Sequence, residues 1–432
     1  MKTLLNQLRR HCAGNRFHFR LLRPLALCAL CCVSPVAARA GSPPVVANVS
    51  AAQRPSTDPH PKFVDIFYTL SDPDSTFVNV SVIVSEDSGA TWTVPAKTFT
   101  SDSPVGTVSV TATPTLKIIT WDAGTDWDGH YTTHCRVRVL ANDGGLVLIP
   151  FGGYQRGNFV ASQGSGDADI TDAPPYSVVV GAFLMDRTLV TGGMWYLVRD
   201  RYADSHGYTF ENPGSFKASN HPVQTVNWLD AVKWCNARSE MEGATPVYYT
   251  SATYATVLKT GTAGSTTPFV KPGANGYRLP TEAEWEKAAR GGTNSLRFPN
   301  ADVLTAYSAN YYGDPADFPY DIGANGYSSE WATGSFPYTS TVDLDLYHTG
   351  YENGYHLHDM AGNVFEWCWD RYGASYYAAG QTDPQGPSSG SNRVMRGGSW
   401  DSYASLARCA NRFSTSPAFA SSNRGFRCVK GL

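Results

Sequence analysis

The clearest helix start in this chain lies in the stretch Gly276-Tyr-Arg-Leu-Pro-Thr-Glu-Ala-Glu-Trp-Glu-Lys-Ala-Ala-Arg-Gly-Gly292. Thr281 precedes Glu284 by three residues, which is the spacing of a capping box. In such a box the threonine hydroxyl accepts a hydrogen bond from the amide of Glu284, and the glutamate carboxylate accepts one from the amide of Thr281. The stretch therefore predicts a capped helix that begins after Thr281.

A second helix is predicted upstream, over Asn227-Trp-Leu-Asp-Ala-Val-Lys-Trp-Cys235. Its apolar residues follow the i, i+3, i+4, i+7 pattern of a helix that packs along one face. The residues of this face are Trp228, Ala231, Val232 and Cys235. The chain around both helices is rich in Gly, Tyr and Trp, and the tryptophans are expected in a core more often than in a sugar site. These features predict an α+β, loop-rich domain over residues 149–432.

Residues 41–148 have a different pattern and are predicted to form an all-β sandwich of about 100 residues. Short segments with alternating β-branched residues are separated by turn sequences such as Asp-Ser-Gly. The predicted strands are Phe63–Leu70, Val78–Val84, Thr107–Thr111 and Arg136–Leu140. The segment resembles the immunoglobulin or fibronectin type III class, which implies a spacer or adhesion module.

Five segments of the later domain resemble, in order, the motifs of the formylglycine-generating enzyme family, also called sulfatase-modifying factors. These segments are His221–Trp228, Gly276–Gly292, Asp359–Trp367, Arg393–Trp400 and Gly425–Cys428. The resemblance implies a variant of the C-type lectin fold. It also implies an activity, the oxidation of a sulfatase cysteine to formylglycine, with copper held by two cysteines.

The two residues that would hold copper are absent from this sequence. The resemblance places the first copper cysteine two residues after the aromatic residue of the Gly-Gly-Ser-aromatic motif, where this chain has Ser402, and the second at Ala404. Since Cu(I) selects thiolate ligands, copper is not expected. Iron is not expected either, because the iron-dependent sulfoxide synthases of the superfamily carry their histidines mainly in a separate helical domain. The β-rich N-terminal region does not resemble that domain.

An enzyme of the same superfamily that uses another site stays open as the alternative. It would be a metal-dependent oxidoreductase that modifies proteins or small thiols, and its weak catalytic candidates are Ser399 and Cys409. No His/Asp constellation can be placed beside them from the sequence.

Calcium is the ligand that the sequence supports best. Four positions of one loop, at i, i+3, i+5 and i+7, offer two carboxylates and two backbone carbonyls, the hard oxygen ligands of Ca²⁺. These positions are Asp359, Gly362, Val364 and Glu366. They resemble a calcium site of the family, and a weaker second site would use Asn310, the carbonyl of Tyr311, Asn325 and Tyr327. The alternative is that Asn363 and Glu366 only brace the loop through hydrogen bonds.

Two histidines stand beside this loop. His356 and His358 are two residues apart and could share one side of an extended segment. Without a third and fourth ligand, both are expected to face solvent rather than to bind a transition metal.

Of the nine cysteines, five lie beyond residue 40. The family resemblance implies a disulfide between Cys235 and Cys428. It matches Cys409 with a family cysteine whose usual partner lies where this chain has Ala289, so Cys368 is the substitute partner that we predict. Cys135 would then be a buried thiol of the sandwich.

The C-terminal segment after the Gly-Gly-Ser-Trp motif mixes small polar residues with aromatic ones. Tyrosine supplies rigid contact area and Ser or Asn supply adaptable hydrogen bonds, which is the composition of a recognition surface. The resemblance points the same way, because lectin-like proteins of diversity-generating retroelements vary the corresponding segment. The alternative is that these residues only suit tight loops. The candidate ligand-binding residues are Trp400, Asp401, Ser402, Tyr403, Asn411, Phe413 and Phe419.

Residues 1–40 are predicted to be a signal peptide. They hold seven basic residues and no acid, then an apolar stretch and the pattern Ala38-Arg39-Ala40. A retained membrane anchor is the alternative, although the apolar stretch is shorter than the roughly 20 residues of a span. Cleavage leaves 27 basic against 37 acidic residues, a net charge of −10. This acidity argues against nucleic acid as a partner. The signal peptide predicts a periplasmic, cell-surface or secreted protein.

The sequence therefore predicts an exported two-domain protein. Its expected role is that of a calcium-stabilised module that binds a protein, peptide or glycan. No transmembrane span is expected after signal cleavage.

Overall fold

The computed structural model describes residues 44–73, 77–89, 92–130, 132–142, 145–305, 308–322 and 352–432. The predicted signal peptide lies outside these residues. No helix among the described residues combines the length and the apolar character needed to cross a bilayer.

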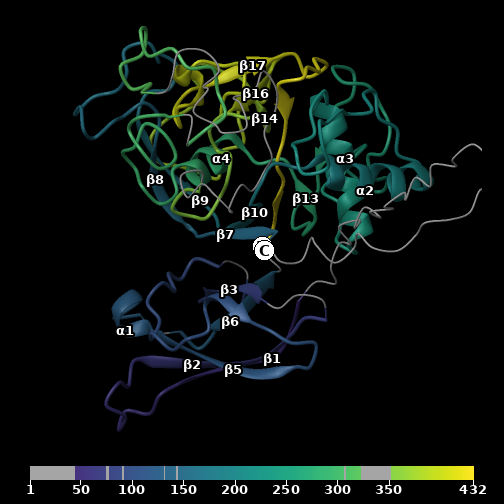
Figure 1. Ribbon diagram of the computed structural model, residues 1–432. Helices are drawn as coiled ribbons and strands as arrows, with labels where there is room; N and C mark the ends of the chain where they lie inside the picture. The colour runs from purple at the N-terminus through teal and green to yellow at the C-terminus, as the bar shows by residue number, and fades with distance from the viewer. Residues whose placement is uncertain are drawn as a thin grey trace, which may run out of the picture. The chain divides into compact units, whose positions relative to one another are not determined.

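The N-terminal part contains two antiparallel, three-stranded sheets (Figure 1). The first has the order β1-β2-β5 and the second the order β4-β3-β6. Their bounds are Val45–Gln53 for β1, Phe63–Ser71 for β2, Phe77–Ser85 for β3, Gly106–Ser109 for β4, Thr115–Asp122 for β5 and Arg136–Asn142 for β6. A short helix, α1, follows β5 over Ala123–Asp126. The four predicted strands are present, whereas β1 and β5 were not predicted.

The two sheets share one hydrophobic core. Ile66 and Tyr68 of β2 and Trp121 of β5 pack in one cluster with Val80 of β3 and Val139 of β6. Alternate residues of β2 are buried, as expected for a strand with one face on a core. The arrangement is a β-sandwich. The prediction that Cys135 is a buried thiol is wrong, because this residue lies exposed just before the edge strand β6.

The C-terminal part is built from short strands and long loops, as predicted. Its sheets have the orders β13-β19-β10-β7, β17-β16-β14-β18, β15-β9-β8 and β11-β12. Their strands are β7 Leu146–Ile149, β8 Gly152–Arg156, β9 Tyr176–Val180, β10 Phe183–Asp186, β11 Tyr248–Tyr249, β12 Phe269–Val270, β13 Tyr277–Arg278, β14 Phe365–Arg371, β15 Gln381–Thr382, β16 Arg393–Arg396, β17 Phe413–Thr415, β18 Arg424–Gly425 and β19 Val429–Lys430. Since β7 pairs with β10, this part begins at Leu146, slightly before the predicted boundary.

The helices of this part are α2 over Gly192–Arg201, α3 over Trp228–Met241 and α4 over Glu282–Ala289, with 3-10 turns η1 at Ala203–His206 and η2 at Ala404–Ala407. The predicted capping box of α4 is confirmed. The amide of Glu284 donates to Thr281 Oγ1 at 3.2 Å, and the amide of Thr281 donates to Glu284 Oε2 at 2.8 Å.

Helix α3 is buried over nearly its whole length and not along one face only. Its polar residues are accommodated by pairing: Lys233 Nζ lies 3.2 Å from Asp230 Oδ1, and both side chains are fully buried. Asp230 also accepts hydrogen bonds from the amides of Glu211 and Asn212. The apolar pattern thus predicted a packed helix but underestimated its burial.

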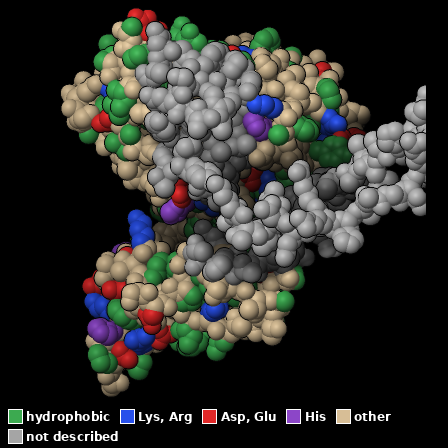
Figure 2. Space-filling view, in the orientation of Figure 1, with side chains coloured by type: hydrophobic (Ala, Val, Ile, Leu, Met, Phe, Trp, Pro, Cys, Tyr) green, Lys and Arg blue, Asp and Glu red, His purple; other side chains and the backbone are tan. Residues whose placement is uncertain are grey.

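The large tryptophans form the core, as predicted. The side chains of Trp195, Trp228, Trp234, Trp285 and Trp367 are all nearly or fully buried. On the surface, by contrast, Figure 2 shows basic and acidic side chains scattered among polar and apolar ones over the visible face.

Candidate functional site

The segment that follows β16 contains both predicted copper positions. Ser402 is buried, and its Oγ lies 2.6 Å from Ser399 Oγ. Ser399 Oγ also donates to Asp401 Oδ1 at 2.7 Å. Ala404, at the start of η2, is fully buried and offers no polar side-chain atom. The two positions therefore hold a hydroxyl network and a methyl group instead of two thiolates.

Among the described residues, no histidine is hydrogen-bonded to either of the alternative catalytic candidates, Ser399 and Cys409. Burial raises the pKa of the Cys409 thiol to about 12, so the thiol keeps its proton at neutral pH and is a poor nucleophile. The hydroxyl of Ser399 is held by Asp401 and Ser402, and none of its hydrogen bonds reaches a histidine. The geometry does not favour nucleophilic catalysis at either residue.

Part of the predicted ligand-binding set does meet at the surface. Trp400 Nε1 donates to the carbonyl of Ser422 at 3.2 Å, and Asn423 Nδ2 donates to Asp401 Oδ1 at 3.0 Å. These bonds hold the segment after β16 against the segment before β18. Tyr403 is 45% exposed, and so it offers a large ring to solvent at this place.

Aromatic residues from other loops extend this surface. The ring of Tyr312 meets that of Tyr403 edge-on at 5.5 Å, and the ring of Phe318 lies 5.9 Å from it. On the other side, Phe419 is 49% exposed and lies under the guanidinium of Arg424, at 4.4 Å. We call Trp400, Asp401, Tyr403, Phe419 and Asn423 the C-terminal surface. Asn423 and Tyr312 were not among the predicted ligand-binding residues. Asn423 is not aromatic, and Tyr312 lies outside the C-terminal segment.

Three predicted ligand-binding residues have contacts within the fold. Ser402 is buried, and the ring of Phe413 stacks on Phe365 with centroids 4.9 Å apart. The carbonyl of Asn411 accepts from Arg396 Nη1. Ser402 is thus buried, whereas Asn411 and Phe413 are half-buried, and the role of these three residues in ligand binding stays a prediction.

The predicted calcium loop lies buried before and within β14. Its backbone is tightly coiled, with positive φ at Asp359 and Gly362. A Cβ on Gly362 would stand 2.3 Å from the carbonyl oxygen of Asn310, so only glycine fits there. The carboxylates of Asp359 and Glu366 are both buried, and this donor set suits a hard cation.

A guanidinium competes for one of these ligands. Arg427 Nε donates to Glu366 Oε2 at 2.7 Å, and its Nη2 donates to Oε1 at 2.9 Å. Arg427 Nη2 also reaches the carbonyls of His358 and Asp359. A calcium ion at this loop would therefore share Glu366 with a buried arginine, and the sequence did not reveal this competitor.

The second predicted calcium site can be followed only in part. Asn310 lies beside the first loop, and its carbonyl accepts from the amide of Asn363 at 2.8 Å. Asn325 and Tyr327 lie outside the described residues. Among the described residues, no group of three His, Cys, Asp or Glu side chains is arranged to hold a metal ion. His356 faces solvent as predicted, whereas His358 is buried, contrary to the prediction.

The cysteines are free thiols throughout the described residues. The sulfur atoms of Cys235 and Cys428 lie 3.4 Å apart, in contact but unbonded. Cys368 and Cys409 are buried in one hydrophobic cluster. Both disulfides stay predictions.

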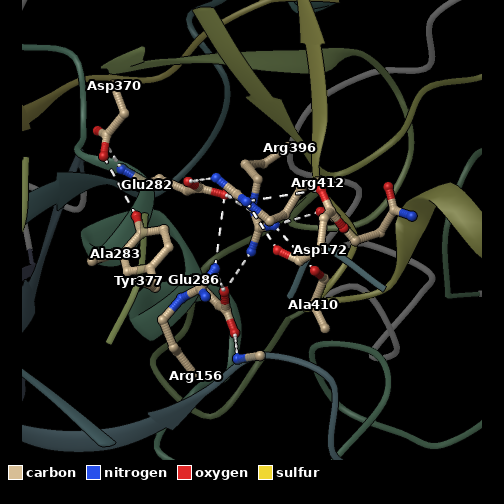
Figure 3. A network of polar contacts seen from close by, with 12 residues as sticks. Arg156, Asp172, Glu282, Ala283, Glu286, Asp370, Tyr377, Arg396, Ala410 and Arg412 are labelled. Atoms are coloured by element: carbon tan, nitrogen blue, oxygen red, sulfur yellow. Dashed lines mark hydrogen bonds and ion pairs between the residues drawn. The ribbon is translucent and has the colours of Figure 1, made fainter. Parts of the chain in front are cut away.

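A buried network of charges anchors the C-terminal surface to helix α4 (Figure 3). Arg396 Nη2 donates to Glu286 Oε2 at 2.7 Å and to the carbonyl of Cys409 at 2.6 Å. Arg412 Nε donates to Glu282 Oε1 at 2.6 Å. The two glutamates of α4 thus hold both arginines that flank the chain from β16 to β17.

Glu286 has three cationic neighbours. Burial alone would raise its pKa, but Arg156, Arg290 and Arg396 outweigh burial and lower the pKa to about 2. Arg156 is fully buried, with Nη2 3.5 Å from Glu286 Oε2 and its guanidinium 3.5 Å from the ring centre of Tyr377. Glu286 is therefore an anion that compensates several buried cations.

Asp370, on β14, lies at the edge of the same network. It accepts from the amide of Glu282 at 2.8 Å, and burial together with repulsion from Glu282 raises its pKa to about 8. Its carboxyl group is thus mostly protonated at neutral pH.

Short strands, the helices α2, α3 and α4 and long loops fit the class of C-type-lectin-like domains. The chain belongs to the sulfatase-modifying factor family: residues 137–432 match the family described as "Sulfatase-modifying factor enzyme 1-like domain". The match begins at β6, so it does not confirm the immunoglobulin resemblance of the sandwich.

Relatives of known name agree with this family. The chain is 32% identical to the formylglycine-generating enzyme of Thermomonospora curvata over 281 residues, which are 60% of this chain and 74% of that protein. It is 41% identical to the formylglycine-generating enzyme of Streptomyces coelicolor over 163 residues, 36% of this chain and 46% of the relative. A solved structure, Treponema denticola variable protein 1, is similar with a TM-score of 0.50 and 26% identity, over 68% of this chain and 96% of that chain.

Proposed function

We propose that this protein is an exported binding module of the sulfatase-modifying factor family that does not make formylglycine. Its C-terminal surface would bind a protein, peptide or glycan. The observation that carries this proposal is the pair of buried residues Ser402 and Ala404 at the places of the copper cysteines. Without thiolates there, the chain lacks the ligands that Cu(I) selects.

The exposed residues support a binding role. Tyr403 and Phe419 present rigid aromatic area, and Asp401 and Asn423 add polar groups whose positions are set by hydrogen bonds. Aromatic residues beside oriented polar groups are typical of recognition surfaces. The similarity to a protein named as variable agrees with the expectation that this segment serves recognition.

Formylglycine generation is the second candidate, since two relatives bear that name. One experiment separates the two functions: the protein is co-expressed with a cysteine-containing sulfatase peptide, which is analysed by mass spectrometry, and the purified protein is analysed for metals. We expect no formylglycine and no bound copper. Stoichiometric copper with conversion of the peptide would contradict the proposal.

The binding role is tested with arrays of immobilised glycans and peptides. We expect Tyr403→Ala to weaken the binding of array hits about ten-fold, the effect of losing an aromatic hot spot. Tyr196→Ala is the matched control, because Tyr196 on α2 is 46% exposed. Equal loss in both variants would refute a role for the C-terminal surface.

We further propose that the loop of Asp359 and Glu366 binds calcium. At free calcium 100-fold above Kd, binding stabilises the folded state by about 2.7 kcal/mol, or about 5–10 °C in Tm for a domain of this size. Scanning calorimetry with calcium and with a chelator should show this difference. Asp359→Ala should abolish it, because alanine offers no side-chain oxygen ligand, whereas Asp401→Ala, at an exposed acid, should not. A Tm unaffected by chelation would mean that Arg427 alone neutralises Glu366.

A further inference from the structure

The sandwich has an open strand edge beside a cavity. Strand β6 pairs with β3 on one side, and no strand pairs with its other side among the described residues. The next strand along the chain, β7, pairs with β10 instead of continuing this sheet. In the other sheet, β1 is likewise an edge strand, paired only with β2 (Figure 1).

A cavity of about 650 Å³ lies between these two edges. It is lined by Val49, Ser50, Ala51 and Gln53 of β1 and by Arg136 and Val137 of β6, together with Trp121 and Trp127. Trp121 is nearly fully buried, and the ring of Trp127 stacks on His130 at 5.2 Å. The volume falls within the roughly 300–1,000 Å³ of typical ligand pockets. The walls of the cavity thus combine aromatic and apolar side chains with charged ones, among them Lys62 and Asp128, beside a free strand edge.

The charges at this edge indicate which side chains would fit. Alternate residues of β6, Val137 and Val139, face the core, so Arg136 and Arg138 stand on the outer face. Their cross-strand neighbours on β3 are Ser85 and Ile83, which carry no charge. Arg136 donates to the carbonyl of Cys135, and Arg138 lies 4.4 Å from the ring centre of Trp92. Neither arginine has a carboxylate partner among the described residues.

We propose that the sandwich binds an extended peptide by adding it as a strand to the free edge of β6. An added strand satisfies the backbone N–H and C=O groups of an open edge, which is the basis of recognition by strand addition. Because side chains alternate along a strand, every second residue of the peptide would stand on the face of Val137 and Val139, where apolar side chains fit. The residues between them stand beside Arg136 and Arg138, and acidic ones would form cross-strand ion pairs.

The ligand is therefore a segment that alternates apolar and acidic residues. The test uses the full chain and a synthetic peptide that alternates valine and glutamate. Two control peptides are used. One alternates valine and lysine, and the other has the same numbers of valine and glutamate as the test peptide but places each type in one block. Fluorescence polarisation should show the valine–glutamate peptide binding roughly ten-fold more tightly than either control, as two cross-strand ion pairs and an alternating pattern would give.

Charge reversal and hydrogen exchange provide the decisive readouts. Arg136→Glu with Arg138→Glu, both at exposed positions, should transfer the preference to the valine–lysine peptide. Hydrogen exchange should show new protection of the β6 amides in the complex. Equal binding of the alternating and block peptides, or protection confined to other strands, would overturn the proposal. A dimer by light scattering that the double variant dissociates would identify a second copy of the chain as the occupant, and would also overturn it.

Discussion

Replacing Glu286 by alanine is expected to lower the free energy of unfolding by about 3–5 kcal/mol, the cost of removing one partner from a buried ion pair. Glu286 is fully buried, and its carboxylate faces Arg156, Arg290 and Arg396. It also accepts the amide of Gly157 at 2.6 Å. Without this anion, Arg290 would lose its ion pair, and Arg156 and Arg396 would keep Glu282 as their remaining carboxylate neighbour among the described residues, at 3.9 and 3.5 Å.

Urea unfolding of the full chain measures this effect. Lys62→Ala is the control, since Lys62 and Asp128 form an exposed pair whose loss should cost no more than about 1 kcal/mol. If Glu286→Ala does not fold, Glu286→Gln can replace it, because glutamine keeps the shape of the side chain and an acceptor oxygen. Its loss of unfolding free energy should lie between those expected for Glu286→Ala and Lys62→Ala. A loss below about 1 kcal/mol in the glutamine variant would show that the network is not stabilised by the charge of Glu286.

The same substitution should also loosen the chain just beyond η2. Arg396 links Glu286 to the carbonyls of Cys409 and Asn411 in this segment. We therefore expect faster hydrogen exchange in residues 409–411 of Glu286→Gln than in Lys62→Ala. This segment is held by a helix more than 100 residues away in sequence.

The distance in sequence between contacting residues decided which contacts could be predicted from the sequence. The capping box was predictable because Thr281 and Glu284 are local, and it is confirmed. Arg290 follows Glu286 by four residues, but the other arginine partners of Glu286 and Glu282 come from β8, β16 and the chain near β17, so no local pattern reveals them. For the same reason Arg427 was missed as the partner of Glu366, although the motif that contains it was recognised.

Burial was the least predictable property. Helix α3 shows an amphipathic pattern, yet its charged residues are buried in pairs such as Asp230 with Lys233. His358 and Cys135 were assigned the wrong exposure: His358 lies between buried neighbours, and Cys135 lies between exposed ones just before β6. Sequence patterns describe which residues can be buried, whereas long-range partners decide which of them are.

Asp370 should make the protein less stable as the pH rises from about 4 to about 8. Its folded-state pKa is about 8, because burial and then Glu282 disfavour the charged form, whereas the unfolded value is near 3.8. The folded state thus keeps a proton that the unfolded state releases across this interval. One pKa unit corresponds to 1.36 kcal/mol, so the loss between pH 5 and pH 8 is roughly 3–4 kcal/mol.

Asp370→Asn should remove most of this slope. The asparagine oxygen can still accept from the amide of Glu282, and its amide group can donate to the oxygen of Tyr377, whose hydroxyl lies 3.4 Å from Asp370 Oδ1 (Figure 3). Asp401→Asn, at an exposed aspartate, should keep the wild-type slope. Unfolding should be measured from pH 5 to pH 8, since the lowered pKa of Lys287, about 8, adds an opposite trend above that range.

The sign of the stability change in Asp370→Asn at pH 7 shows whether Asp370 is protonated or ionised in the folded protein. If Asp370 holds a proton, its carboxyl group adds no charge beside Glu282. Arg396 and Arg412 are then compensated by Glu282, Glu286 and Asp172. The folded state then loses stability on both sides of about pH 4–5, because Glu286, with its pKa of about 2, must be protonated in acid. If Asp370→Asn instead retains the wild-type slope, Asp370 is ionised when folded and is itself one of the anions that hold Arg412. In that case Asp370→Asn should destabilise the protein at pH 7, where a protonated Asp370 predicts a gain.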